Sequence, residues 1–197
     1  MDPDRMANDR LRYVTERLPQ LQGLILMPLS LFFLARGMYR AGAFPLPWDA
    51  DPRMPGRWAG VGLVLVIAAY RPIRKWYRGR YADAPQSIRY SQLTPILAGI
   101  AALPIGYAIQ PVLPFSAPLS LIALLVGAYG VRDYPFRRHY LAAAAILLAC
   151  ALRRILGIPE GIVGPLFDLS VAAALAVAGI GDHLLLTSTL EPVQAYA

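Results

Sequence analysis

The amino-acid sequence predicts an all-α fold, a polytopic transmembrane bundle of six spans with both termini in the cytoplasm. Composition is the first reason, because 57% of the 197 residues are hydrophobic and only 16% are charged, whereas a typical soluble domain carries roughly 25% charged residues. The second reason is the mean hydropathy of +0.46. The third is that the basic residues lie mostly between long apolar stretches, as orientation charges do in membrane proteins.

Each predicted span is a mostly apolar stretch near the length that a membrane-crossing helix needs. About 20 residues are required, since roughly 30 Å of hydrocarbon is crossed at 1.5 Å per residue. We expect a short amphipathic helix over 5–17 before the first span, and a single integral membrane domain over 1–197. The predicted spans are 18–38, 56–77, 93–112, 115–131, 140–156 and 162–186.

The distribution of basic residues predicts the orientation and the partners of this bundle. The N-terminal segment and the connections after the second and fourth spans hold most of them, and the positive-inside rule places those segments in the cytoplasm. The net charge of +7 is therefore expected to face anionic lipid headgroups rather than nucleic acid. A single cysteine, Cys150, allows no internal disulfide.

A basic and aromatic segment follows the apolar part of the second predicted span. Its cations can meet lipid phosphates while its rings lie at headgroup depth. Anionic-lipid binding or docking of an acidic partner is one interpretation, and plain topology determination is the other. We favour topology, because the positive-inside rule already requires such charge. The residues of this basic patch are Arg71, Arg74, Lys75, Trp76, Arg78 and Arg80.

Three ionisable residues fall inside or near the last two predicted spans. Asp168 lies about one and a half turns into the sixth span, and Arg153 and Arg154 lie near the end of the fifth. Charges within a span are costly, so we expect one of the arginines to pair with Asp168 across this helical hairpin. A proton or ion site at Asp168 is the alternative.

His139, Asp182 and His183 are expected together at the cytoplasmic interface. Interfacial capping explains them best, because a metal site needs three or four convergent ligands. A proton relay or metal cluster built from these three side chains is the alternative interpretation. We expect no metal and no other cofactor.

Two short segments carry a resemblance to other proteins. The Arg- and Tyr-rich segment from Tyr70 to Tyr81 and the Gly-x-x-Asp-His-x-Leu-Leu-like ending from Gly179 to Leu186 resemble a loose set of small, uncharacterised bacterial six-helix inner-membrane proteins. The resemblance implies a multi-pass protein of the inner membrane and assigns no activity.

The sequence contains none of the common catalytic signatures. It has no G-x-S-x-G, H-E-x-x-H, P-loop or C-x-x-C motif, so we do not expect an enzyme. We predict a structural or accessory subunit, or scaffold, of a membrane assembly, with other membrane subunits as partners. The alternative is a small transporter or permease whose polar site is formed by Asp168 with Arg153 or Arg154.

Overall fold

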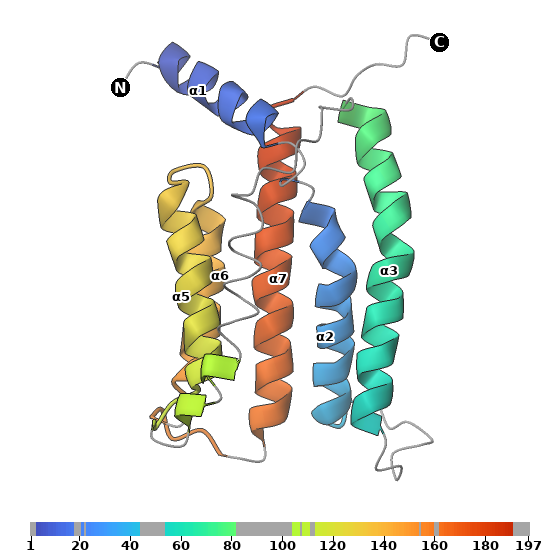
Figure 1. Cartoon of the computed structure of the whole chain (residues 1–197), viewed down its shortest axis with the longest axis vertical. Helices are drawn as coiled ribbons and strands as arrows, with labels where there is room; N and C mark the ends of the chain where they lie inside the picture. The colour runs from blue at the N-terminus through green and yellow to red at the C-terminus, as the bar shows by residue number, and fades with distance from the viewer. Residues whose placement is uncertain are drawn as a thin grey trace.

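The computed structural model shows a bundle of long helices with one helix lying across its end (Figure 1). It describes residues 3–17, 21, 23–43, 54–81, 104–106, 108–110, 113–153, 155–159 and 162–190. Seven helices have defined bounds within these ranges. They are α1 (Pro3–Glu16), the 3-10 helix η2 (Gly23–Leu26), α2 (Met27–Arg40), α3 (Met54–Tyr81), α5 (Ala117–Arg132), α6 (Arg138–Ala151) and α7 (Val163–Thr187).

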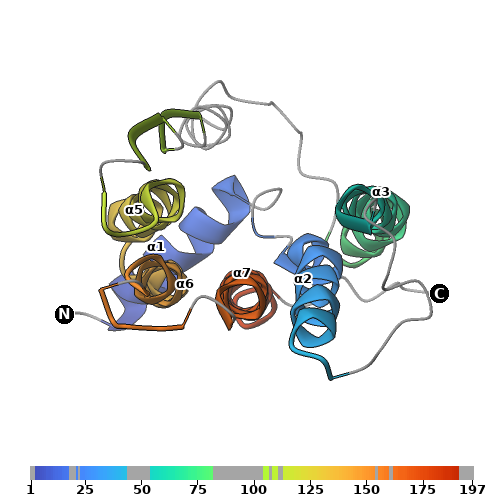
Figure 2. The ribbon, with the colours of Figure 1, turned by 90° about the horizontal axis from the view of Figure 1, so that it is seen from below.

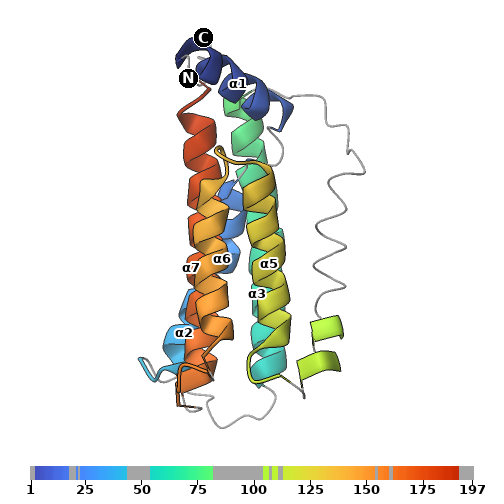
Figure 3. The same ribbon diagram turned by 90° about the vertical axis from the view of Figure 1, so that its left-hand side faces the viewer.

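Helix α7 occupies the middle of the bundle and organises the others around it. It packs against α2, α6 and η2, while α5 packs on α6 and α3 packs on α2 (Figure 2). Helix α1 crosses the end of the bundle where α3 and α7 terminate (Figures 1 and 3). Polar groups placed on α7 are thus within reach of both flanking helices.

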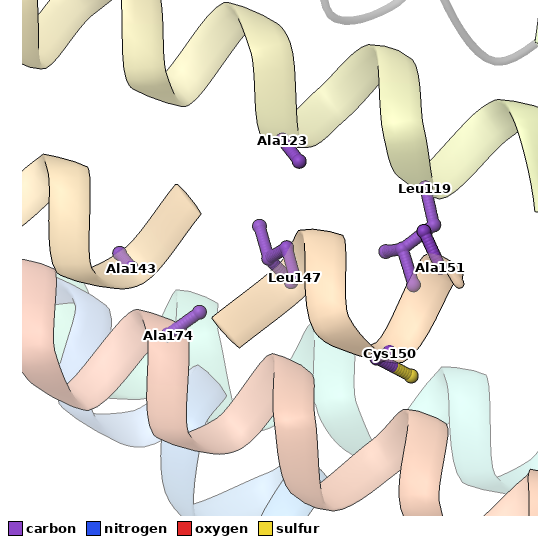
Figure 4. Close-up of a cluster of buried hydrophobic side chains, with 7 residues drawn as sticks. All are labelled: Leu119, Ala123, Ala143, Leu147, Cys150, Ala151 and Ala174. Atoms are coloured by element: carbon purple, nitrogen blue, oxygen red, sulfur yellow. The ribbon is translucent and has the colours of Figure 1, made fainter. Parts of the chain in front are cut away.

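Small side chains allow the helices on one side of α7 to approach closely. Ala123 of α5, Ala143 and Ala151 of α6 and Ala174 of α7 are all buried there, and Cys150 is buried among them (Figure 4). A second apolar cluster lies beneath α1 and joins it to α3 and α7. Its buried members are Val14, Leu21, Tyr77, Tyr81, Leu185 and Leu186.

The six-span prediction is wrong, because most of the helices do not combine the necessary length with an apolar composition. Within the described ranges only α7 is long and apolar enough to cross a membrane. Helices α2 and α6 have 14 residues each, about 21 Å at 1.5 Å per residue and well short of the hydrocarbon thickness. Helix α3 has 28 residues but ends in a basic segment. The predicted span 93–112 lies mostly outside the described residues.

Ion pairs inside the bundle also argue against the six-span arrangement. The carboxylates of Asp133, Asp168 and Asp182 are buried, and each has an arginine nitrogen within 4 Å. With at most one candidate span, the multi-pass description, the N-in/C-in topology and the inner-membrane localisation are corrected together. The helical class and the position of the N-terminal amphipathic helix agree with the sequence prediction.

Two glycines let η2 and α7 come into backbone contact. A Cβ atom on Gly179 would lie 2.7 Å from the carbonyl oxygen of Gly23 and 3.3 Å from the Cβ of Leu26. Backbone atoms cannot move aside as the end of a side chain can, so a methyl group at this position forces the helices apart.

We expect Gly179→Ala to lower the free energy of unfolding by about 2 kcal/mol, the usual cost of overpacking. Gly127→Ala is the matched control, because its Cβ would meet only the Cβ of Ala144 at 3.4 Å. Alanine there should gain up to about 1 kcal/mol of helix propensity. Urea denaturation followed by circular dichroism measures both, and equal losses would contradict the close contact.

Candidate functional site

A cavity of about 430 Å³ lies between α2, α5 and α7. This volume is in the range of small-molecule sites, roughly 300–1,000 Å³. Its wall is apolar on the α5 side and basic on the α2 side. The lining residues are Arg36, Arg40, Gln110, Ser116, Pro118, Leu119, Ile122, Arg153, Val163, Gly164 and Phe167.

Asp168 of α7 holds the arginines on the α2 side of the cavity. Its side chain is fully buried, and its Oδ2 atom lies 3.4 Å from the Nε of Arg36 and 3.4 Å from the Nη1 of Arg40. Arg36 and Arg40 are four residues apart, so both project from one face of α2. Gly37 brings that face close, since a Cβ there would lie 2.9 Å from the Cγ of Leu169. The four-residue spacing of the two arginines and the lack of a side chain on Gly37 together allow this geometry.

Arg153 brings a third guanidinium group to the cavity from the turn after α6. Its Nε atom is buried and has no hydrogen-bond partner, and the same holds for the Oδ1 atom of Asp168. Such groups are costly to leave unpaired. Among the residues that the structure describes here, three positive charges thus face one negative charge, an arrangement that favours an anion.

Burial raises the pKa of Asp168, while the positive charges of Arg36 and Arg40 act in the opposite direction. Burial is the larger effect, because it disfavours the charged carboxylate. Protonation of Asp168 therefore sets in at a higher pH than for an exposed aspartate. It would leave the arginines without their counter-charge.

The wall opposite α2 is held by the side-chain amide of Gln110. Its Nε2 donates to the carbonyl oxygen of Phe115 at 2.9 Å, and its Oε1 accepts from the backbone N–H of Ala117 at 3.0 Å. Both bonds lie in the turn that leads into α5. The amide is thus occupied in shaping the wall, and the arginines supply the donors for a ligand.

A second polar cluster, centred on Arg137, lies at the other end of α7. The Arg137 side chain is fully buried, with its Nε atom 3.9 Å from the Oδ2 of Asp133 and 3.9 Å from the Oδ1 of Asp182. Its guanidinium carbon lies 4.5 Å from the ring centre of Tyr129 and 5.5 Å from that of Tyr140. Cation–π contacts of this kind stabilise a desolvated guanidinium.

The two aspartates of the Arg137 cluster also attach α1 and α6. Asp133 accepts hydrogen bonds from the Nη1 of Arg17 at 2.6 Å and from the hydroxyl of Tyr13 at 3.0 Å. On α7, Asp182 accepts from the hydroxyl of Tyr140 at 2.8 Å. Burial raises the pKa of both Tyr13 and Tyr140, so both phenols stay protonated as donors. This cluster fastens α1 across the end of the bundle.

The structure places His139 next to Asp182, whereas His183 lies next to α3. The Nε2 of His139 lies 3.0 Å from the Oδ1 of Asp182, and the Nδ1 of His183 lies 2.9 Å from the hydroxyl of Tyr77. Burial raises the pKa of Tyr77 to about 12 and lowers the pKa of His183. Within the described part of the chain, no three His, Cys, Asp or Glu side chains are placed to hold a metal ion.

The structure pairs Asp168 with arginines of α2 rather than with Arg153, the described arginine after α6. Asp168 meets Arg36 and Arg40 of α2, Arg153 lines the same cavity, and Arg154 lies outside the described residues. The sequence analysis did not single out Arg36, Arg40 or Arg137. The spacing of four between Arg36 and Arg40 was a usable signal, because it places two cations on one helix face.

The basic patch lies along the last turns of α3. Arg74 is half-buried, and Arg71, Lys75, Trp76, Arg78 and Arg80 are exposed. Tyr77, which lies between them in sequence, points inward and is buried.

The chain has no significant match to a protein-family model, to a curated protein or to a solved structure. The resemblance noted for residues 70–81 and 179–186 stays a prediction.

We expect Arg137→Met to lower the free energy of unfolding by about 3 kcal/mol. Methionine fills much of the space but leaves the two buried carboxylates without the cation between them. The adjacent Arg138→Met is the control, since Arg138 is exposed and such changes usually stay within about 0.5 kcal/mol. Similar urea midpoints for the two variants would contradict the structural role of Arg137.

Proposed function

We propose that the chain is a helical binding protein that takes a small dianion into the arginine-lined cavity. The observation that carries the proposal is the charge of the cavity, which the guanidinium groups of Arg36, Arg40 and Arg153 line. The carboxylate of Asp168 lies behind Arg36 and Arg40 and is the one carboxylate paired with them among the described residues. A ligand with two negative charges balances the excess. Arginine suits this role, because its planar fork of donors matches carboxylate, phosphate and sulfate oxygens.

The cavity is accessible enough for a ligand to enter. The side chains of Arg36 and Arg40 keep 25% and 41% of their surface exposed, whereas Asp168 behind them has none. The cations can thus meet a ligand that arrives from outside, while the carboxylate holds them in position before binding. Such preorganisation lowers the cost of ordering long side chains on association.

We expect Arg153→Gln to weaken the binding of sulfate about tenfold or more. A charge-assisted hydrogen bond contributes about 1.5–3 kcal/mol, and 1.4 kcal/mol corresponds to a factor of ten. Isothermal titration calorimetry with sodium sulfate, at constant ionic strength set by sodium chloride, measures the affinity. Arg12→Gln is the control, because Arg12 belongs to α1, which crosses the end of the bundle opposite to the start of α7 (Figure 1). This variant should leave the affinity for sulfate unchanged. Absence of sulfate binding, or equal losses in both variants, would contradict the proposal.

The affinity for sulfate should rise as the pH is lowered through the pKa of Asp168. Sulfate stays dianionic over this range, whereas protonation of Asp168 removes the negative charge that competes with it. Asp168→Asn keeps a side-chain oxygen that accepts from the arginines and holds them in position, but it removes the competing charge. This variant should therefore bind sulfate about tenfold more tightly at neutral pH, the effect of about 1.4 kcal/mol, and should lose this pH dependence. Weaker binding by the asparagine variant at every pH would show that the anion does not replace the carboxylate.

An accessory or scaffold role is a second proposal, supported by the apolar exterior of α5. Leu124 and Val131, two turns apart on one face of that helix, are 63% and 65% exposed. Large exposed apolar side chains on one helix face are typical of surfaces that contact another molecule. Ligand binding in the cavity and assembly through this face of α5 do not exclude one another.

A further inference from the structure

The rotation of α3 about its own axis is fixed by contacts along its inner side. Gly62 lies against the ring of Phe32, where a Cβ would be 3.0 Å from the Cε1 and Cζ atoms. Four turns later, the hydroxyl of Tyr77 accepts a hydrogen bond from the backbone N–H of Leu24 at 3.2 Å. The opposite side of α3 is therefore held outward over the whole stretch between these contacts.

That outward side is a continuous stripe of apolar and then basic residues. Val64, Ile67, Arg71, Lys75 and Arg78 follow one another at spacings of three and four residues and are all exposed. Positions at these spacings share one face of a helix. Helix α3 contains no aspartate or glutamate, and it lies at the edge of the bundle (Figure 2). We call these five residues the α3 stripe.

Aromatic rings lie beside the cations in the same turns. Trp76 is 43% exposed, and the guanidinium carbon of Arg80 lies 5.6 Å from the centre of its ring. Tyr70 is also exposed, with the guanidinium carbon of Arg74 5.7 Å from its ring centre. Both rings lie on the flanks of the α3 stripe rather than on it, since neither residue shares its spacing and the Trp76 ring centre lies 6.0 Å from that of His183 on α7. Tryptophan and tyrosine beside arginine at the edge of a basic surface are typical of headgroup depth.

We propose that the α3 stripe docks on the surface of an anionic phospholipid bilayer. Its basic half meets the headgroup phosphates, and its apolar half, with Val64 and Ile67, meets the upper part of the acyl chains. A nucleic acid would be attracted by the cations but would leave the aliphatic half of the stripe in water. The topology explanation of the basic patch no longer applies, because it required a multi-pass arrangement.

Co-sedimentation with vesicles tests the proposal. We expect the 197-residue chain to bind phosphatidylcholine vesicles that contain roughly a third phosphatidylglycerol, and to bind pure phosphatidylcholine vesicles far less. Removing two cations with the double variant R71Q/K75Q should weaken binding about 25-fold, since each basic residue near such a surface contributes about a factor of five. Raising the salt concentration should weaken the wild-type chain more than this variant.

The control is the double variant R132Q/R138Q, which loses the same charge from two exposed arginines of the α5–α6 end. It should bind the anionic vesicles within a factor of about two of the wild-type chain. Equal weakening of the two double variants would show that net charge, not the α3 stripe, governs binding. Vesicle binding that does not depend on phosphatidylglycerol would also overturn the proposal. So would binding to a DNA or RNA oligonucleotide without binding to vesicles.

Sulfate titrations distinguish a failure of membrane docking from a failure of anion binding in the cavity. The R71Q/K75Q variant should bind sulfate as the wild-type chain does, because neither residue lines the cavity. Arg153→Gln should bind vesicles as the wild-type chain does, because Arg153 lines the cavity and is not part of the α3 stripe.

Discussion

The buried carboxylate of Asp168 is the constraint on which the arrangement of this bundle depends. A charge inside a helical bundle is tolerated only when it is paired, so α7 must meet a helix that supplies cations at the depth of Asp168. Helix α2 does so with Arg36 and Arg40, which are separated by one turn. Their pairing is incomplete, however, because the Oδ1 of Asp168 has no hydrogen-bond partner and Arg153 adds a further positive charge nearby. The interaction that joins α2 to α7 thus also creates a cavity with an excess of cations.

Helix positions could be predicted from the sequence, but membrane crossing could not. The apolar run 162–186 corresponds to α7 within a residue at each end. The run 140–156 is apolar throughout, yet α6 ends at Ala151 and the chain turns through Gly157, whose φ is +69°. An apolar run includes residues that lie beyond the end of the helix, so its length overestimates the length of helix available to cross a membrane. Hydropathy also does not reveal which apolar residues are used for contacts between helices.

The candidate site could also be predicted only in part, because the sequence does not show which helices pack against one another. Asp168 stood out because a carboxylate inside an apolar run is costly, and the structure indeed buries it. Its partners depend on which helix packs against α7 and how that helix is rotated, which are tertiary properties. Arg137 was missed because its four-residue separation from Asp133 is common on protein surfaces. The pair is buried by tertiary contacts, from Tyr13 of α1 and from the rings of Tyr129 and Tyr140.

X-ray diffraction from crystals soaked in selenate tests the central claim most directly. Selenate has the charge and shape of sulfate, and its selenium atom is located by anomalous scattering. We expect an anomalous peak inside the cavity, with the selenate oxygens within hydrogen-bond distance of Arg36, Arg40 and Arg153. An empty cavity, in crystals whose surface arginines do bind selenate, would contradict it.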